Sequence, residues 1–253
     1  MPRKKAKIIT IAEIKGGTGK TTTAAALAQA AALDDLQVLL IDLDAQANLT
    51  TMFGADPTKP GAWNLLEGFP AVELIQQTYF DNIEIIAGAP NLAAEIPQKG
   101  SLYRLEAAIM PLLTDYDLIL IDTPPAFGEM TYNALQASNG LLIALDADIS
   151  ALQGFYYITD LAKAAKRTNA KLKVLGAIIT RYNPRPIINR QTRDIIAEKA
   201  QAIRCPVIGE IREGVSIKEA KAYGKNLFTY APKSKPAQDY KALYNYMVYN
   251  KFV

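Results

Sequence analysis

Short, continuous apolar runs alternate along this chain of 253 residues with longer segments that are amphipathic or rich in alanine. Runs rich in Ile, Leu and Val are typical of strands buried on both faces, and the longer segments are typical of helices. The pattern predicts strands at residues 8–12, 38–41, 83–87, 118–121, 140–145, 172–180 and 207–211, and helices at residues 21–33, 102–113, 151–167, 187–203 and 235–249.

This alternation predicts an α/β fold, with a mostly parallel sheet and helices on both of its faces. Half of the residues are hydrophobic, and no Gly/Ser-rich linker, low-complexity block or internal repeat interrupts the pattern. We therefore expect a single domain over residues 1–253, with residues 1–7 as a basic, flexible tail. That tail lacks the apolar segment of a signal peptide, and no run is long enough to span a membrane.

A glycine-rich loop separates the first expected strand from the first expected helix. Its glycines tolerate positive φ and let backbone N–H groups approach an anion, and the helix N-terminus adds aligned dipoles. In such a loop Lys20 can reach the β- and γ-phosphates of a nucleotide, and the Thr21 hydroxyl can bind Mg²⁺. The residues expected to bind ATP are Lys15, Gly16, Gly17, Thr18, Gly19, Lys20, Thr21 and Thr22.

The loop departs from the general pattern G-x-x-x-x-G-K-[ST], because Ile14 stands where the first glycine would be. What stands instead is K-G-G-x-G-K-T-T, with Lys15 as an additional cation. This arrangement resembles the deviant Walker A signature of the ParA/MinD family of ATPases. The resemblance implies a P-loop NTPase-like fold with ATP and Mg²⁺ as ligands.

Further motifs extend the resemblance over nearly the whole chain. Residues 42–48 match the D-x-D-P-Q-x-N motif of ParA proteins, except that Ala45 replaces the proline, and Asp122 follows a buried strand at the Walker B position. Residues 151–154 and 230–234 also resemble ParA proteins. A carboxylate at a strand end can by itself be a helix cap or a loop residue. Open parallel sheets bind ligands at the carboxyl ends of their strands, and these motifs all lie there.

The resemblance assigns a role to each of these residues. Lys15 would reach across a dimer interface to the partner's nucleotide, and Asp44 would orient the attacking water. Thr21 and Asp122 would belong to the Mg²⁺ site, with Asp42 supporting the metal shell or the loop. Residues 180–184 match a MinD-like segment whose arginine packs against adenine, which would be Arg181 here; the alternative is a strand end that turns into a loop.

The charge of the chain is divided unevenly. Residues 1–162 hold 9 basic and 19 acidic side chains, whereas residues 163–253 hold 19 basic and 6 acidic ones. A basic half indicates a face that binds a polyanion in a salt-dependent way. ParA relatives use two basic regions to hold the DNA backbone, so we expect contacts to non-specific double-stranded DNA, with a solvated helix face as the alternative. The candidates are Arg185, Arg190, Arg193, Lys218, Lys221 and Lys225.

The resemblance implies a bacterial, cytoplasmic, nucleoid-associated ATPase for plasmid or chromosome partition. It would dimerise with ATP, bind DNA, and be stimulated by a ParB-type centromere-binding protein. The alternatives are a MinD-like membrane-associated ATPase and an ATPase that positions another cargo. Residues 240–253 hold only two lysines, so we expect this end to pack on its own domain and not to bind a membrane. With no histidine and a single cysteine, Cys205, histidine catalysis and cysteine-clustered metal sites are excluded.

Overall fold

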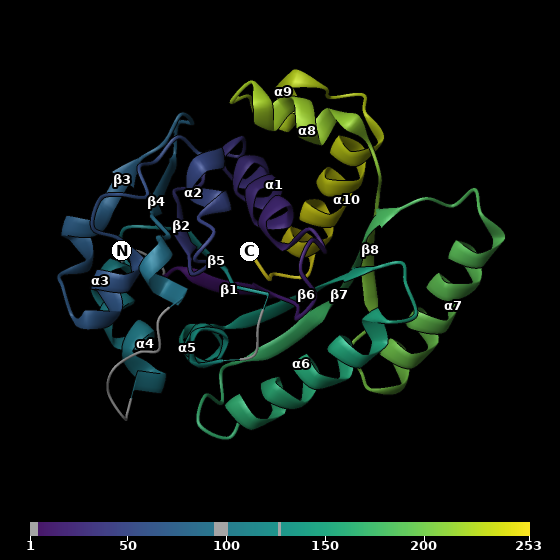
Figure 1. The fold of residues 1–253 in the computed structure, drawn as a ribbon, viewed down its shortest axis with the longest axis horizontal. Coiled ribbons are helices and arrows are strands. Elements are labelled where there is room, and N and C mark those ends of the chain that lie inside the picture. Colours follow the sequence, from purple (N-terminus) through teal and green to yellow (C-terminus); the bar gives the residue numbers. More distant parts are fainter. Residues whose placement is uncertain (1–4, 94–100, 126–127) are drawn as a thin grey trace.

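The computed structural model describes residues 5–93, 101–125 and 128–253 (Figure 1). Its strands are β1 (Lys7–Ala12), β2 (Val38–Asp42), β3 (Ile75–Gln77), β4 (Ile83–Ile86), β5 (Leu118–Asp122), β6 (Gly140–Asp146), β7 (Lys173–Tyr182) and β8 (Val207–Arg212). Its α-helices are α1 (Lys20–Ala32), α2 (Asn48–Met52), α3 (Ala62–Glu67), α4 (Arg104–Ile109), α5 (Glu129–Ala137), α6 (Ala151–Ala165), α7 (Ile187–Ala202), α8 (Val215–Ala222), α9 (Leu227–Tyr230) and α10 (Lys235–Tyr249).

All eight strands belong to one sheet, in the order β3-β4-β2-β5-β1-β6-β7-β8. Every neighbouring pair is parallel except β3 and β4, which are antiparallel at one edge. β1 lies between β5 and β6, so the loop that follows β1 is flanked by the carboxyl ends of both neighbours. The predicted α/β fold with a mostly parallel sheet is confirmed.

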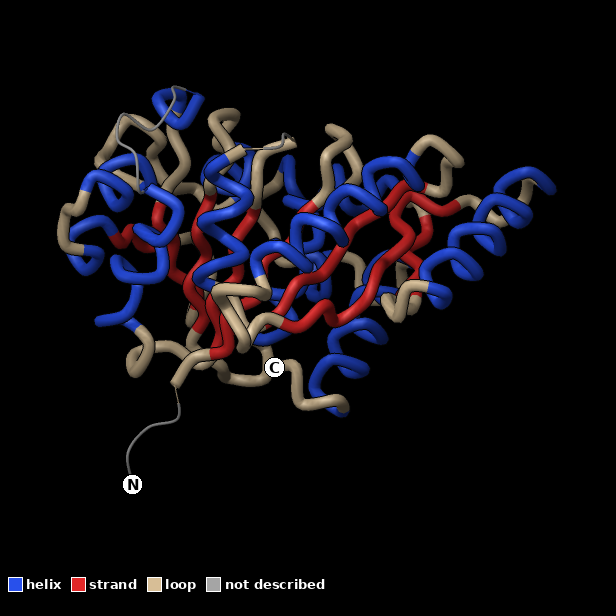
Figure 2. Tube along the Cα trace, turned by 90° about the horizontal axis from the view of Figure 1, so that it is seen from below, coloured by secondary structure: helices blue, strands red, loops and turns tan. Residues whose placement is uncertain are grey.

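Helices cover both faces of the sheet (Figures 1 and 2). Successive strand residues point to opposite faces, so in β2 Leu40 packs into the cluster beneath α1 and α10, whereas Leu39 and Ile41 pack beneath α3, α4 and α5. A third cluster joins α6 and α7 to β6 and β7. The central strands β1, β2, β5 and β6 are buried on both faces, which explains why they are largely continuous apolar runs.

The C-terminal helix packs on its own domain, as expected. Tyr240, Leu243, Tyr244 and Met247 of α10 are buried in the same cluster as the alanines of α1. The Tyr240 hydroxyl lies 3.2 Å from that of Thr23 in α1. Among the residues that the structure describes, every helix is too short or too polar to cross a bilayer.

The helix expected at residues 102–113 is wrong in its extent. Only Arg104–Ile109 is α-helical, and 3₁₀ turns lie on either side. Pro111 lacks a backbone N–H and its ring clashes with the preceding turn of an α-helix, which ends α4 early. The basic tail is shorter than expected, because Lys7 already belongs to β1 and Ala6 is buried. Residues 1–4 of that tail lie outside the described residues.

Candidate nucleotide site

The loop between β1 and α1 is held in shape by backbone conformation and by β7. Gly17 and Gly19 have φ values of +78° and +83°, which disfavour any side chain. A Cβ on Gly19 would lie 3.4 Å from the side chain of Thr180. The Thr180 hydroxyl donates to the carbonyl oxygens of Thr18, at 2.5 Å, and of Leu145, at 3.1 Å. The loop is thus fixed to the ends of β6 and β7.

Lys20 lies inside the cleft that this loop borders. The cleft has a volume of about 690 Å³, and its wall includes Gly17, Thr18, Gly19, Lys20, Thr21, Thr22 and Asp44. Lys20 is only 6% exposed. Burial lowers the pKa of its ammonium, and the carboxylates of Asp122, Asp44 and Glu13 oppose that shift. A buried cation surrounded by acids, at a helix N-terminus, is suited to bind an anion.

Asp122 and Asp42 lie side by side because β2 and β5 pair with these two residues opposite each other. Asp122 is fully buried; its Oδ2 accepts a hydrogen bond of 2.6 Å from the Thr21 hydroxyl, and its Oδ1 has no partner among the described residues. Burial, and then repulsion from Asp42, raise the pKa of Asp122 to about 8. An orphan carboxylate oxygen beside a threonine hydroxyl fits a hard divalent cation, which favours the ionised carboxylate.

The Asp42 carboxylate accepts hydrogen bonds from the segment that follows it. Its Oδ1 accepts from the backbone N–H of Asp44 at 3.0 Å, and its Oδ2 accepts from the backbone and the hydroxyl of Thr50 at 3.0 and 2.8 Å. Burial raises its pKa in spite of these bonds. A Cβ on Gly88 would lie 2.8 Å from the Asp42 carboxyl carbon, so that glycine leaves room for it. These contacts favour the loop-supporting role for Asp42 over direct metal binding.

Asp44 lines the cleft, and a backbone N–H holds its carboxylate in place. Its Oδ1 accepts from the backbone N–H of Gln46 at 2.9 Å, which fixes the carboxylate, and both residues line the cleft. The left-handed conformation of Ala47, with φ of +49°, turns the chain back into α2 directly after this segment. The segment therefore presents a carboxylate to whatever the loop binds.

The two lysines of the loop differ in environment. Lys15 has a side chain that is 42% exposed, and its Nζ lies 3.2 Å from Asp148 Oδ2, 3.3 Å from the Ser150 hydroxyl and 4.0 Å from Asp146 Oδ2. Within the described part of the chain, Lys20 belongs to the cleft wall and Lys15 does not. Lys15 thus lies against the β6–α6 connection of its own chain.

Glu13 is a site residue that sequence reasoning missed. It is 2% exposed, and its Oε1 accepts from the backbone N–H of Ile14 at 2.8 Å, beneath the loop. Gly154 of α6 packs so closely on this carboxylate that a Cβ there would collide with it. Burial raises the pKa of Glu13 to about 7. The backbone N–H groups of Ile14 and Lys15 and the charge of Lys20 act in the opposite direction. Its place directly before the loop was the only signal in the sequence.

The raised pKa of Glu13 makes stability depend on pH. Between its ordinary value of 4.5 and about 7, the unfolded chain releases this proton while the folded chain keeps it. The free energy of unfolding therefore falls as pH rises through this window, by on the order of 3 kcal/mol from this group. Glu13→Gln, which cannot ionise, should lose that part of the decline in urea unfolding of the nucleotide-free protein at pH 4.5 and pH 8. Parallel pH profiles for the two proteins would contradict the assignment.

Arg181 lines the cleft at the end of β7 and also contacts the phosphate loop. Its Nη1 donates to the carbonyl oxygen of Gly17 at 2.9 Å and lies 3.9 Å from Asp146. Its backbone is left-handed, with φ of +52°, which turns the side chain back from the end of β7. The wall of the cleft beyond Arg181 is formed by Arg212, Glu213, Ile217, Lys218 and Lys221, and the sequence analysis had not assigned this wall to the nucleotide.

The six candidate DNA-binding residues fall into different settings. Arg185 is exposed, and exposed Arg190 donates to the carbonyl oxygens of Pro184 and Arg185 at 2.8 and 3.2 Å. Arg193 is engaged by acids: its Nε lies 2.7 Å from Glu210 and its Nη1 2.9 Å from Asp194.

The other three candidates belong to α8 and the turn after it. Lys218 and Lys221 line the nucleotide cleft, and Lys225 lies over the rings of Tyr223 and Tyr230 at 5.9 and 5.6 Å. The structure therefore brings Arg185 and Arg190 together at the start of α7, away from the α8 lysines.

A glycine loop after a central parallel strand, a buried lysine, and acids on two neighbouring strands define a P-loop nucleoside triphosphatase. A family model described as an AAA domain matches residues 6–174. The chain belongs to this family, as a member of its ParA/Soj-type group of ATPases.

Individual relatives extend the likeness over the full length. The chromosome-partitioning ATPase Soj of Thermus thermophilus is 32% identical over 246 residues, covering 96% of each chain. The crystal structure of cobyrinic acid a,c-diamide synthase from Mycobacterium smegmatis, with a bound ATP analogue and magnesium, has a TM-score of 0.83 at 27% identity, covering 97% of this chain and 96% of that one. The cell division ATPase MinD of Pyrococcus furiosus has a TM-score of 0.79 at 27% identity, covering 97% and 99%.

Proposed function

We propose that this protein is a Mg²⁺-dependent ATPase that dimerises with ATP, binds non-specific double-stranded DNA, and drives plasmid or chromosome partition. Its hydrolysis is stimulated by a ParB-type centromere-binding partner, and residues 1–253 act as one ATPase domain. The family and the Soj relative support a partition or positioning ATPase. The observation that supports dimerisation is the position of the two loop lysines. Lys20 lies in the wall of the cleft, and Lys15 lies outside it, beside Asp148.

Different residues of the cleft bind the phosphates and the Mg²⁺ ion. Lys20 and the backbone N–H groups of the loop hold the phosphates, in a setting where burial strengthens each electrostatic contact. Thr21 and Asp122 hold Mg²⁺, which, when bound, neutralises charge on the phosphate oxygens. Asp42 keeps Asp44 and α2 in place from below.

Asp44 and Lys15 carry out the catalytic steps. Asp44, fixed by the Gln46 N–H, orients the water that attacks the γ-phosphorus. Lys15 leaves its contacts with Asp148 and Ser150 and stabilises charge on the phosphoryl group held by the partner subunit. ATP thereby holds two subunits together, and hydrolysis separates them.

Replacing Lys15 tests the cross-subunit role. Lys15→Ala should bind ATP with little loss of affinity and remain a monomer, because Lys15 lies outside its own cleft. Light scattering coupled to gel filtration, with and without ATP, measures this. The matched control is Lys163→Ala, which removes an exposed lysine paired with Asp160 on α6. An ATP-dependent dimer that forms equally well in Lys15→Ala would reject the role.

The start of α7 is the better place to test DNA binding, because two of the α8 lysines also face the nucleotide cleft. Arg185→Glu combined with Arg190→Glu should weaken retention on duplex DNA about equally for all sequences, and reduce the slope of log K against log salt by about two. Filter binding at several salt concentrations measures both. The matched control is Lys163→Glu in α6 with Lys166→Glu directly after it, and equal losses in the two variants would contradict a specific DNA surface.

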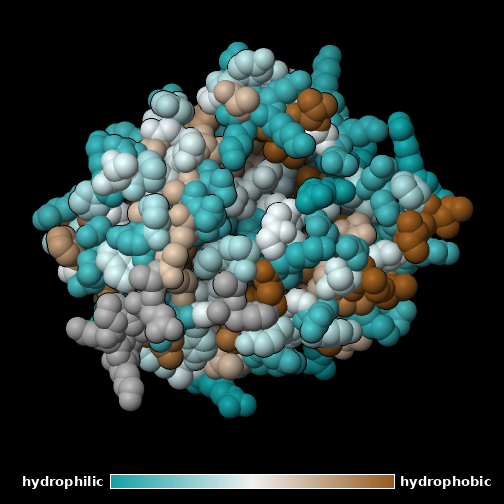
Figure 3. All heavy atoms as spheres, in the orientation of Figure 1, coloured by the Kyte–Doolittle hydropathy of each residue, from teal (hydrophilic) through white to brown (hydrophobic). Residues whose placement is uncertain are grey.

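A second candidate is a MinD-like ATPase that works at a membrane. It is favoured by the likeness to MinD and by exposed apolar residues on α7, where Ile187 and Ile188 are each 65% exposed. Figure 3 shows hydrophobic residues gathered at the right edge of the molecule, over α7. The buried apolar face of α10 opposes it, since that helix is not free to enter a bilayer. ATP-dependent sedimentation with phosphatidylglycerol vesicles separates the two candidates.

A further inference from the structure

A second cavity lies at the opposite end of the sheet from the nucleotide cleft. It has a volume of about 760 Å³ and is bordered by the amino ends of β1, β6 and β7, by α4, and by the chain end after α10. β1 begins at this cavity and ends at the phosphate loop, so its six residues separate the two sites by about 20 Å. The cavity is of the size that small organic ligands occupy in proteins.

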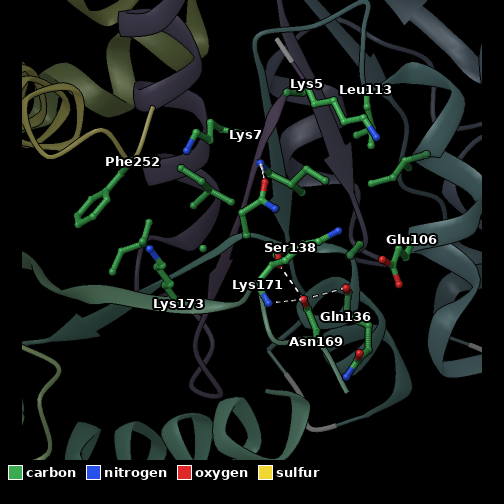
Figure 4. Close-up of a pocket in the computed structure, with 18 of the residues that line it drawn as sticks. Lys5, Lys7, Glu106, Leu113, Gln136, Ser138, Asn169, Lys171, Lys173 and Phe252 are labelled. Carbon is green, nitrogen blue, oxygen red and sulfur yellow. Dashed lines mark hydrogen bonds between the residues drawn. The ribbon is translucent and has the colours of Figure 1, made fainter. Parts of the chain in front are cut away.

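The wall of this cavity is strongly basic. Glu106 is the one acid that lines it within the described residues, against five lysines. Among those residues, none of the five lysines forms a salt bridge; Lys7 Nζ lies 3.4 Å from the carbonyl oxygen of Lys251. Figure 4 shows lysines on both sides of the space, with Lys5 and Lys7 above and Lys171 and Lys173 below. The basic residues are Lys5, Lys7, Lys171, Lys173 and Lys251.

The loop that carries Lys171 is held rigidly by Asn169. The Asn169 amide donates to the carbonyl oxygens of Leu135, Gln136 and Ser138 at 3.0, 3.0 and 2.8 Å, and its oxygen accepts from the backbone N–H of Lys171 at 3.1 Å. Asn139 likewise joins β1 to β7, because its side chain accepts from Ile8 N–H at 2.9 Å and its carbonyl oxygen from Lys173 N–H at 2.9 Å. The lysines therefore start from fixed backbone positions, which lowers the entropic cost of binding.

Uncharged polar residues and apolar side chains line the rest of the cavity, and five large apolar residues matter most here. They are Ile109, Met110, Leu113, Leu175 and Phe252. Met110 is 59% exposed, although it stands beside the buried Ile109. Contacts to the DNA backbone are polar and would leave this apolar wall uncovered. A ligand with an apolar or aromatic body would bury apolar surface against the wall.

We propose that this cavity binds a soluble organic phosphate of small-molecule size. The lysines hold its phosphate groups, and the apolar wall holds a non-polar or aromatic body. The site is separate from the nucleotide cleft, and the proposal does not depend on the ATPase function. It accounts for part of the basic charge of residues 163–253, to which Lys171, Lys173 and Lys251 belong.

The experiment uses the full chain with Lys20→Ala, which disables the phosphate loop. The probe is 1-anilinonaphthalene-8-sulfonate, an aromatic anion that fluoresces in an apolar site, displaced by dissolved tripolyphosphate. Lys171→Glu with Lys173→Glu should weaken dye binding by about tenfold or more, since two attractive charges become repulsive. Both lysines are exposed, so circular dichroism should report an unchanged fold.

The control is Lys166→Glu with Lys233→Glu, an equal charge change at exposed positions outside the cavity. It should bind the dye as the parent does. Equal losses in the two variants, or no displacement by tripolyphosphate, would overturn the proposal. Two further measurements test whether the lysines bind DNA or a lipid headgroup instead. Displacement by duplex DNA at equal phosphate concentration would assign the lysines to DNA, and lysine-dependent capture on phosphatidylglycerol vesicles would assign them to a lipid headgroup.

Discussion

Lys20→Ala should weaken ATP binding by about a hundredfold or more, corresponding to roughly 3 kcal/mol. The lysine is buried at the helix N-terminus, and its ammonium is a cation of the cleft wall within the phosphate loop. Its loss also removes the positive charge that acts on the carboxylates of Asp122, Asp44 and Glu13, so their negative charge opposes an incoming polyanion more strongly. Isothermal titration with ATP and Mg²⁺ measures the effect.

A fold control belongs with that measurement, because removing a buried cation among acids can also destabilise the domain. Thermal unfolding of Lys20→Ala without nucleotide shows whether the protein is folded at the titration temperature. Lys163→Ala, on the exposed face of α6, should bind ATP like the parent. A folded Lys20→Ala that keeps its ATP affinity would remove the phosphate-loop assignment.

Asp44→Ala should lose about a hundredfold or more in the rate of hydrolysis while ATP affinity is nearly kept. Asp44 lines the cleft, whereas the hydrogen bond of the Thr21 hydroxyl goes to Asp122, so we expect binding to depend little on Asp44. Single-turnover hydrolysis with saturating ATP separates chemistry from binding. Asp81→Ala, at an exposed position before β4, is the matched control. If Asp44→Ala hydrolyses ATP at the parental rate, another group must orient the water.

Local signals made much of this fold predictable. The apolar runs for β2, β5 and β6 are right to within one residue, since a strand buried on both faces is apolar at nearly every position. The phosphate loop was predictable for a similar reason, because its glycines and Lys20 stand together in the sequence. The helix predicted at residues 235–249 matches α10 at both ends. Ser234 caps its N-terminus.

Other features depend on contacts between distant parts of the chain. The antiparallel strand β3 follows from pairing with β4, because its three residues, Ile75–Gln77, carry no apolar run of their own. Glu13 becomes a site residue because Gly154 of α6 leaves room above it. Lys218 and Lys221 face the cleft because α8 folds back over it from β8. No local pattern encodes these positions, since each depends on how separate elements pack.

The two basic regions also differ in what the sequence could reveal. The excess of basic residues after residue 162 was visible as a count, but the count treats the whole region as one surface. In the fold, Arg185 and Arg190 lie at the carboxyl end of β7, whereas Lys171 and Lys173 lie at its amino end. A long parallel strand thus separates charges that are close in sequence.

Retention of the Asp44→Ala protein on non-specific duplex DNA, with ATP, ADP or no nucleotide and at two salt concentrations, tests the central claim most directly. The variant should hold the ATP state, and therefore the dimer, without turnover. We expect retention with ATP alone, weakened by salt as phosphate contacts exchange with counterions. Failure to bind DNA with ATP, or equal binding in all three nucleotide states, would contradict an ATP-switched partition ATPase.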